Sequence, residues 1–133
     1  MGSPLVRSYR DLKVWRRAVA LTTTCYRLTT AFPKCETYGL TAQIRRSAVS
    51  VASNIAEGHG RRRTRDYLRF LSIANGSLME LETQFIIAGN LKYVTPDAGR
   101  RLLARSTEVG RMLAGLIRAL RRQLKDSGFG IQA

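Results

Sequence analysis

Apolar and polar positions alternate along this chain with the period of an α-helix in four separate segments. In each segment the apolar residues recur at steps of three and four, which places them on one face of a helix. The four rows are Leu12, Trp15, Val19, Thr22 and Tyr26; Ile44, Ala48, Val51 and Ile55; Tyr67, Leu71, Ala74, Leu78, Leu81, Phe85 and Ala88; and Leu102, Val109, Leu113, Leu116, Leu120 and Leu124. No segment has the period-two alternation of a half-buried strand. The pattern predicts helices near residues 11–31, 40–57, 64–91 and 96–125.

Start and stop signals between the rows support these boundaries. The residue before a proline disfavours the helical conformation, so the first helix ends before Pro33. Gly58 and Gly60 are C-cap candidates for the second helix, and Thr64 is an N-cap candidate for the third. Thr95 opens the fourth helix, with a proline at the first helical position. Because the connecting loops are short, we expect an all-α fold, an antiparallel up-down four-helix bundle.

The fourth helix carries a second apolar row, about 100° from the first. Its members are Leu103, Thr107, Gly110, Ala114 and Ile117. Gly110 and Ala114 are small enough to let another helix approach closely. A helix that is apolar on two sides needs two partners, so we predict a homo-oligomer interface. The residues assigned to it are Leu103, Gly110, Ala114 and Ile117. The alternative is a single wide stripe that faces a wide core.

Two rows of short polar side chains occupy positions where a solvated face usually carries lysine, glutamate and arginine. They are Gln43, Ser47, Ser50, Asn54 and Glu57 on the second helix, and Ser77, Glu80 and Gln84 on the third. We predict a structural hydrogen-bond network between helices or subunits, with Arg45 or Arg46 paired to one of the two acids. The residues assigned to it are Arg46, Asn54, Glu57 and Glu80. A plain solvated face is the alternative.

Composition sets the scale of the protein and adds a strong charge signal. The 133 residues are 44% hydrophobic, enough for one core, so we expect one domain over residues 1–133. Basic residues number 23 against nine acidic ones, which gives a net charge of +14. Only four of the 23 are lysines, and the planar fork of arginine suits phosphate. The charge predicts a nucleic-acid partner, RNA or DNA; the alternative is a protein whose charge only aids solubility.

Arginines cluster between the second and third helices. They are Arg61, Arg62, Arg63 and Arg65, with Arg69 one turn further along. The start of the third helix also offers unpaired N–H groups and the positive end of the helix dipole, so we predict phosphate binding here. A solvated loop that contacts nothing is the alternative.

A second basic cluster lies on the fourth helix, and its C-terminal members are Arg118, Arg121 and Arg122. These three residues are also predicted to bind nucleic acid by widening the phosphate-tracking surface. The alternative is that these arginines bind no nucleic acid and only complement the negative end of the helix dipole near the C-terminus.

Catalytic, metal and cofactor signatures are absent from the sequence. The one histidine, His59, lies in the arginine-rich loop, and no Walker A, H-E-x-x-H, G-x-S-x-G or dinucleotide motif occurs. We therefore predict no enzyme activity, no catalytic residues, no metal and no cofactor. A ribonuclease that uses His59 as a base is the alternative, although nothing in the sequence orients the imidazole.

Targeting signals are also lacking. The first residues contain no apolar core of a signal peptide, and no run approaches 18 apolar residues. Cys25 and Cys35 have no metal-binding or redox spacing, so we expect reduced thiols. These features predict a cytoplasmic protein with no membrane partner.

Several short motifs resemble one known family. They are Phe32-Pro33, Tyr38-Gly39-Leu40-Thr41, Gln43, Arg45-Arg46, Ser53-Asn54-Ile55-Ala56-Glu57-Gly58, Tyr67, Arg69-Phe70-Leu71, Ile73-Ala74, Gly76-Ser77, Glu80-Leu81-Glu82 and Gln84. Over roughly residues 9–94 the sequence resembles the four-helix-bundle family of ribosomal-RNA intervening-sequence proteins. The related accessory variability determinants of diversity-generating retroelements have a last helix similar to Glu108-Val109-Gly110-Arg111-Met112-Leu113.

The resemblance implies an antiparallel bundle that assembles into a homopentameric ring with a basic surface. In the retroelement branch it also implies binding of RNA or DNA and of a reverse transcriptase. Two departures are visible. Ala52 stands where the family often has proline, which predicts a straighter second helix, and Arg62 and Arg63 make the loop more basic than the family motif.

The leading hypothesis is therefore a basic, oligomeric nucleic-acid-binding protein, accessory to a reverse transcriptase or linked to an intervening sequence of ribosomal RNA. The rival hypothesis is a protein-interaction scaffold without a nucleic-acid role.

Overall fold

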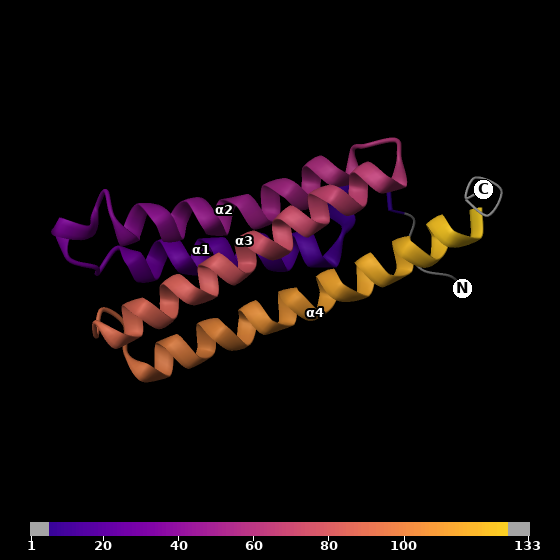
Figure 1. The fold of residues 1–133 in the computed structure, drawn as a ribbon. Helices are drawn as coiled ribbons and strands as arrows, with labels where there is room; N and C mark the ends of the chain where they lie inside the picture. Colours follow the sequence, from indigo (N-terminus) through magenta and orange to yellow (C-terminus); the bar gives the residue numbers. More distant parts are fainter. Residues whose placement is uncertain (1–5, 128–133) are drawn as a thin grey trace.

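The computed structural model describes residues 6–127 (Figure 1). The long helices of this part are α1 (Lys13–Thr29), α2 (Leu40–His59), α3 (Thr64–Asn90) and α4 (Pro96–Ser127). Two short 3-10 turns, η1 (Tyr9–Asp11) and η2 (Lys34–Glu36), precede α1 and α2. Successive helices run in opposite directions (Figure 1). The predicted all-α four-helix bundle is confirmed, and each long helix begins and ends within two residues of its predicted range.

The core lies between helices that each contact two others. α1 contacts α2 and α4, α3 contacts the same two helices, and α2 and α3 pack together most extensively. The largest fully buried apolar side chains are Leu21, Ile44, Ile55, Leu71, Leu81, Leu102 and Leu113. Burial of each such side chain contributes about 1.5–3 kcal/mol to stability. The predicted rows of α2 and α3 form this core, whereas the α4 row is fully buried only from Leu102 to Leu113. Beyond that point α4 extends past the start of α3 (Figure 1).

The predicted core row of α1 was wrong by one position. Val14, Ala18, Leu21 and Cys25 are buried, whereas Val19 is 37% exposed. Both rows have helical spacing, and only the packing of α1 against α2 and α4 decides between them. Burial also raises the pKa of the Cys25 thiol to about 12.

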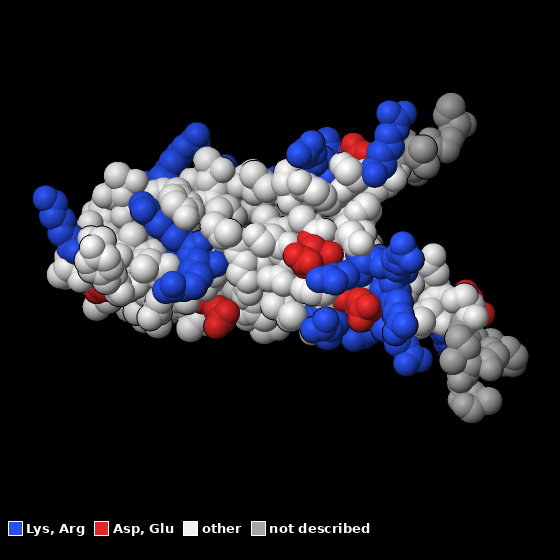
Figure 2. All heavy atoms as spheres, turned by 90° about the horizontal axis from the view of Figure 1, so that it is seen from above, with Lys and Arg blue, Asp and Glu red and all other residues white. Residues whose placement is uncertain are grey.

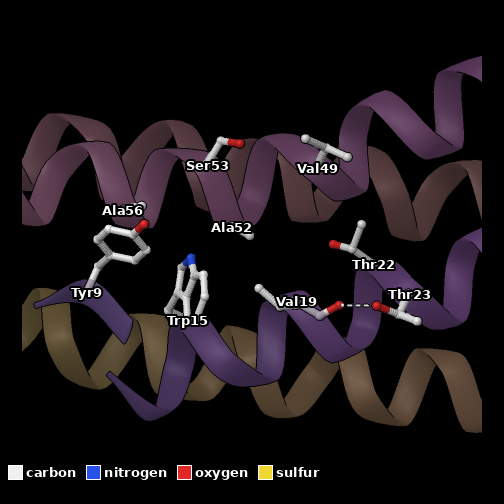
Figure 3. Close-up of a pocket in the computed structure, with 9 residues that line it drawn as sticks. All are labelled: Tyr9, Trp15, Val19, Thr22, Thr23, Val49, Ala52, Ser53 and Ala56. Carbon is white, nitrogen blue, oxygen red and sulfur yellow. Dashed lines mark hydrogen bonds between the residues drawn. The ribbon is translucent and has the colours of Figure 1, made fainter. Parts of the chain in front are cut away.

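The outer row of α1 lines an apolar surface groove instead. Trp15 and Val19 of α1 face Val49 and Ala52 of α2, and Tyr9 of η1 closes one end (Figure 3). The volume of the groove is about 360 Å³. The Tyr9 and Trp15 rings meet edge-on with centroids 5.0 Å apart.

One end of the bundle is closed by packing between its two connections. We call it the closed end; it comprises η2 and the α3–α4 turn at residues 91–95. The Phe32 ring packs edge-on against Phe85, with centroids 6.5 Å apart, and lies 5.3 Å from the Tyr93 ring. The Tyr93 hydroxyl donates a hydrogen bond of 3.0 Å to Glu36 Oε2, which raises the pKa of the phenol. Thr95 caps α4 as predicted, because its hydroxyl accepts a bond from the N–H of Ala98 at 3.2 Å.

Candidate nucleic-acid interface

The turn between α2 and α3 is held tightly because Gly58 has no side chain. Gly58 is buried, and a Cβ atom there would lie 2.9 Å from both Tyr67 Cδ1 and Phe70 Cβ and 3.3 Å from the Tyr67 carbonyl oxygen. Gly58 thus lies inside α2 as a close-approach position, and the predicted C-cap role belongs to Gly60. The same packing raises the pKa of the Tyr67 phenol through burial.

Two of the predicted arginines are oriented by contacts within the turn. Arg61 Nη2 donates to Glu57 Oε2 at 2.6 Å, and its guanidinium carbon lies 4.8 Å from the centre of the Phe70 ring. The guanidinium carbon of Arg69 lies 5.0 Å from the same ring. Aromatic faces attract cations, so Phe70 holds both arginines at the start of α3. Nothing in the sequence pattern singled out Phe70 for this role.

The other three loop arginines extend into solvent. Arg62, Arg63 and Arg65 are exposed, and among the described residues their side chains have no hydrogen bond or ion pair. The backbone of Arg63 occupies the N-cap position of α3, and no side chain caps the helix. Thr64, predicted as the N-cap, is instead the first residue of the helix. The N–H groups of Thr64 and Arg65 therefore remain available to an acceptor from outside, next to three positive charges and the single negative charge of Asp66.

The second predicted cluster lies at the same end of the molecule. Arg118 and Arg121 of α4 line a cleft of about 320 Å³ whose other wall includes Leu68 and Ser72 of α3. Arg65 precedes Leu68 by three residues and thus lies on the same face of α3. Arg122 is exposed on α4 outside this cleft. Figure 2 shows basic side chains gathered where α2 passes into α3.

We call this region the basic end. Its members are Arg61, Arg62, Arg63, Arg65, Arg69, Arg118, Arg121 and Arg122.

The predicted polar network forms only in part. Ser50 and Ser77 hydroxyls lie 2.8 Å apart, and Asn54 Nδ2 donates to the Ser50 carbonyl at 2.8 Å and to its hydroxyl at 3.0 Å. Arg46 and Glu80 line the polar pocket beside these groups. No ion pair joins the two charges within the part of the chain that the structure describes.

The predicted pairing of Arg45 or Arg46 with Glu57 or Glu80 is not what the structure has. Glu57 pairs with Arg61 across one turn at the basic end, outside the polar pocket. Arg45 reaches α1, where it donates to Thr29 Oγ1 at 2.9 Å and lies over the Tyr26 ring. The reason is reach: Arg61 is one helical turn from Glu57, whereas Arg45 faces the neighbouring helix.

The four residues assigned to an oligomer interface are all half-buried within the chain. A Cβ atom at Gly110 would lie 3.4 Å from Leu78 Cδ2, so the helix that uses this small residue is α3 of the same chain. Ala114 and Ile117 line the α3–α4 cleft, and Leu103 is half-buried nearby on α4. More exposed apolar side chains lie on the outer face of α3, where Ile73, Met79, Ile86 and Ile87 are 43–55% exposed.

Groups able to perform catalysis do not converge anywhere in residues 6–127. His59 is half-buried and meets Tyr67 edge-on at 5.8 Å, without a hydrogen-bonded acid. No group of His, Cys, Asp and Glu in the described residues has the arrangement needed to hold a metal ion. Cys25 is buried and Cys35 exposed, and both are free thiols. None of the described helices is long and apolar enough to span a membrane.

The fold and this end surface together define the class: an all-α four-helix bundle with an arginine-rich end. Residues 10–115 match the family model described as 23S rRNA-intervening sequence protein. The match covers well over half of the chain, which therefore belongs to this family. The resemblance seen in the sequence is confirmed at this level.

A solved structure has the same fold. It is a protein of unknown function from the S23 ribosomal protein family of Bacteroides thetaiotaomicron, which is 21% identical with a TM-score of 0.71. The alignment covers 78% of this chain and 97% of that one. At this identity the likeness establishes the bundle and nothing about activity. No curated protein matches the chain.

Proposed function

We propose that this protein binds the phosphate backbone of nucleic acid through its basic end and catalyses no reaction. The observation that carries the proposal is the state of Arg62, Arg63 and Arg65. They are exposed beside an uncapped helix N-terminus, and none of them pairs with an acid within residues 6–127. Phosphate is the group that such an arrangement of N–H donors and guanidinium groups recognises best. Backbone contacts carry no base information, so binding is independent of sequence.

The proposal includes assembly into a homo-oligomer in the cytoplasm. Support for assembly comes from apolar surface that the single chain leaves exposed, in particular Ile86 and Met79 on α3. A ring, with five subunits as the resemblance implies, would repeat the basic end in each subunit, so weak contacts would add through avidity. The free thiols of Cys25 and Cys35 fit a reducing compartment.

The test is a salt series of nucleic-acid binding measured by electrophoretic shift. Arg62, Arg63 and Arg65, which are unpaired within residues 6–127, are changed together to alanine. Each phosphate contact to a single strand contributes about 0.7 to the slope of log affinity against log salt, so the slope should flatten by about 2. Helicity and oligomer size should stay unchanged, because these side chains lie outside the core.

The matched control changes three arginines outside the basic end, Arg27 of α1 and Arg100 and Arg101 at the start of α4, to alanine. Arg100 and Arg101 already pair with Asp97. This control should leave the slope nearly unchanged. A wild-type protein that shows no salt-dependent binding would refute the proposal, and RNA cleavage that is lost in His59→Ala would establish the nuclease alternative.

A protein-interaction role is the second candidate function. The observation that favours it is the apolar groove of Trp15, Val19 and Val49 between α1 and α2 (Figure 3). If the groove carries the function, Val49→Glu should abolish capture of a protein partner and leave nucleic-acid binding intact.

A further inference from the structure

We propose that the α3–α4 cleft at the basic end accepts one unpaired base of a nucleic-acid strand, so that the protein prefers single strands to duplexes. This inference rests on the proposed function and adds a ligand class to it. It starts from the cleft that Arg118 and Arg121 line, which has a volume of about 320 Å³. That volume lies at the lower limit of small-molecule sites and suits a single nucleotide unit.

The chemistry of the cleft wall matches the parts of a nucleotide. Leu68 on the α3 wall and Ile117 on the α4 wall supply apolar surface against which the flat face of a base can rest. Asn75 and Ser72 supply donors and acceptors for the edge of a base, and neither side chain forms a hydrogen bond within the described part of the protein. Arg118 and Arg121 on the other side provide charge for the adjoining phosphates.

The position of the cleft is the second argument. Arg65 lies on the cleft face of α3, one turn before Leu68, and leads back to Arg62 and Arg63. A strand that follows these arginines toward Arg118 therefore passes over the opening of the cleft. Ala114 forms part of the cleft floor and leaves room that a larger side chain would occupy.

The preference for single strands follows from the cost of exposing a base. A base in a duplex is stacked and paired, so its extrusion costs unstacking and unpairing free energy, whereas an unpaired base is already exposed. The Phe70 ring is covered by Arg61 and Arg69, so stacking on that ring does not supply the preference. The cleft is the feature of the basic end that can distinguish a base from bare phosphate.

The experiment compares four probes by fluorescence anisotropy at one salt concentration: 12-nucleotide single strands of RNA and DNA, a 12-base-pair duplex, and a 12-residue abasic strand. The wild-type protein should bind a single strand about tenfold more tightly than the duplex or the abasic strand. The RNA and DNA arms reveal whether the ribose hydroxyl contributes. The abasic strand keeps the phosphates and lacks the bases, so it isolates the cleft.

The matching variant is Ser72→Leu with Asn75→Leu, which fills the cleft and removes both polar edges. It should lower single-strand affinity about tenfold, to the duplex level, and leave duplex affinity unchanged. The control applies the same polar-to-leucine change to Thr83 and Asn90, exposed positions of α3 remote from the cleft, and should change neither affinity. Circular dichroism verifies that both variants fold.

Two results would overturn the inference in different ways. Equal affinity for strand, duplex and abasic probe, unaffected by the Ser72 and Asn75 changes, would refute the base cleft and leave phosphate binding in place. Absence of salt-dependent binding to every probe would refute the proposed function itself, and the base cleft with it.

Discussion

The two ends of the bundle use aromatic and charged side chains in opposite ways. At the closed end the aromatic groups pack on one another, as Phe32 does on Phe85, and the Tyr93 hydroxyl is bonded to Glu36. The acid and the phenol therefore satisfy each other's hydrogen bond.

At the basic end the Phe70 ring serves to hold charges. Phe70 lies against the guanidinium groups of Arg61 and Arg69, and only Arg61 has an acidic partner, Glu57. Like charges concentrated beside a helix N-terminus repel one another. The basic end therefore carries an electrostatic cost that a polyanion would relieve, whereas the charged and aromatic groups at the closed end pair with one another.

The largest expected effect separates stability from binding at the closed end. Phe85 is buried, so Phe85→Ala should lower the free energy of unfolding by about 3–5 kcal/mol. Urea denaturation measures this loss. Nucleic-acid affinity, measured where the variant is folded, should equal that of the wild type because the basic end is remote. A loss of affinity in this variant and in the milder Phe85→Leu would mean that the two ends are coupled.

The next largest effect is expected from disturbing the close packing of Gly58 at the basic end. Gly58→Ala places a Cβ atom 2.9 Å from Tyr67 and Phe70, and relief of this overlap moves the start of α3. We expect a loss of about 1–3 kcal/mol of stability together with weaker binding. The control is Gly60→Ala, whose Cβ would lie 3.6 Å from its nearest neighbour, and it should be tolerated. Equal effects of the two substitutions would contradict the close-approach role of Gly58.

The smallest effect is expected from removing an acidic charge from the basic end. Glu57→Gln removes the acidic partner of Arg61, an exposed pair worth at most about 0.5 kcal/mol of stability, so thermal unfolding should barely change. Binding at low salt should become tighter, because one negative charge is lost and one guanidinium is released. Glu108→Gln, which removes the partner of Arg17 away from the basic end, is the control. Equal tightening in both variants would indicate a response to net charge alone.

The fold was predictable from local patterns because the apolar residues of each helix recur at helical spacing within its own segment. The long unbroken row of α3 and the Thr95-Pro96 start of α4 identified their elements without reference to the rest of the chain. The α1 row failed for a reason that is equally physical. Two adjacent rows of this helix are apolar at helical spacing, and the bulkier row with Trp15 and Val19 lies at the surface groove.

The candidate site was predictable only as a list of arginines. Their number and their place before α3 are properties of the sequence, and so is the net charge of +14. The spacing of Glu57 and Arg61 by one helical turn was a local signal for their ion pair, although the acid was assigned to Arg45 or Arg46. The contact of Arg45 with α1 was not predictable, because it depends on how the helices pack. Arg65, Leu68, Ser72 and Asn75 are spaced so that they share one face of a helix. Nothing in that spacing indicates that α4 lies opposite this face and forms a cleft with it.

The sequence by itself therefore determined four helices, their approximate limits, a basic protein and the position of its arginine-rich turn. The tertiary structure decided which face of α1 is buried, that Gly58 serves close approach, and that Arg118 and Arg121 stand across a cleft from α3. The reason is range. Helical periodicity and capping depend on neighbours within a turn or two of the chain, whereas the buried face of a helix and the cleft between two helices depend on residues distant in the sequence that only the packing of helices brings together.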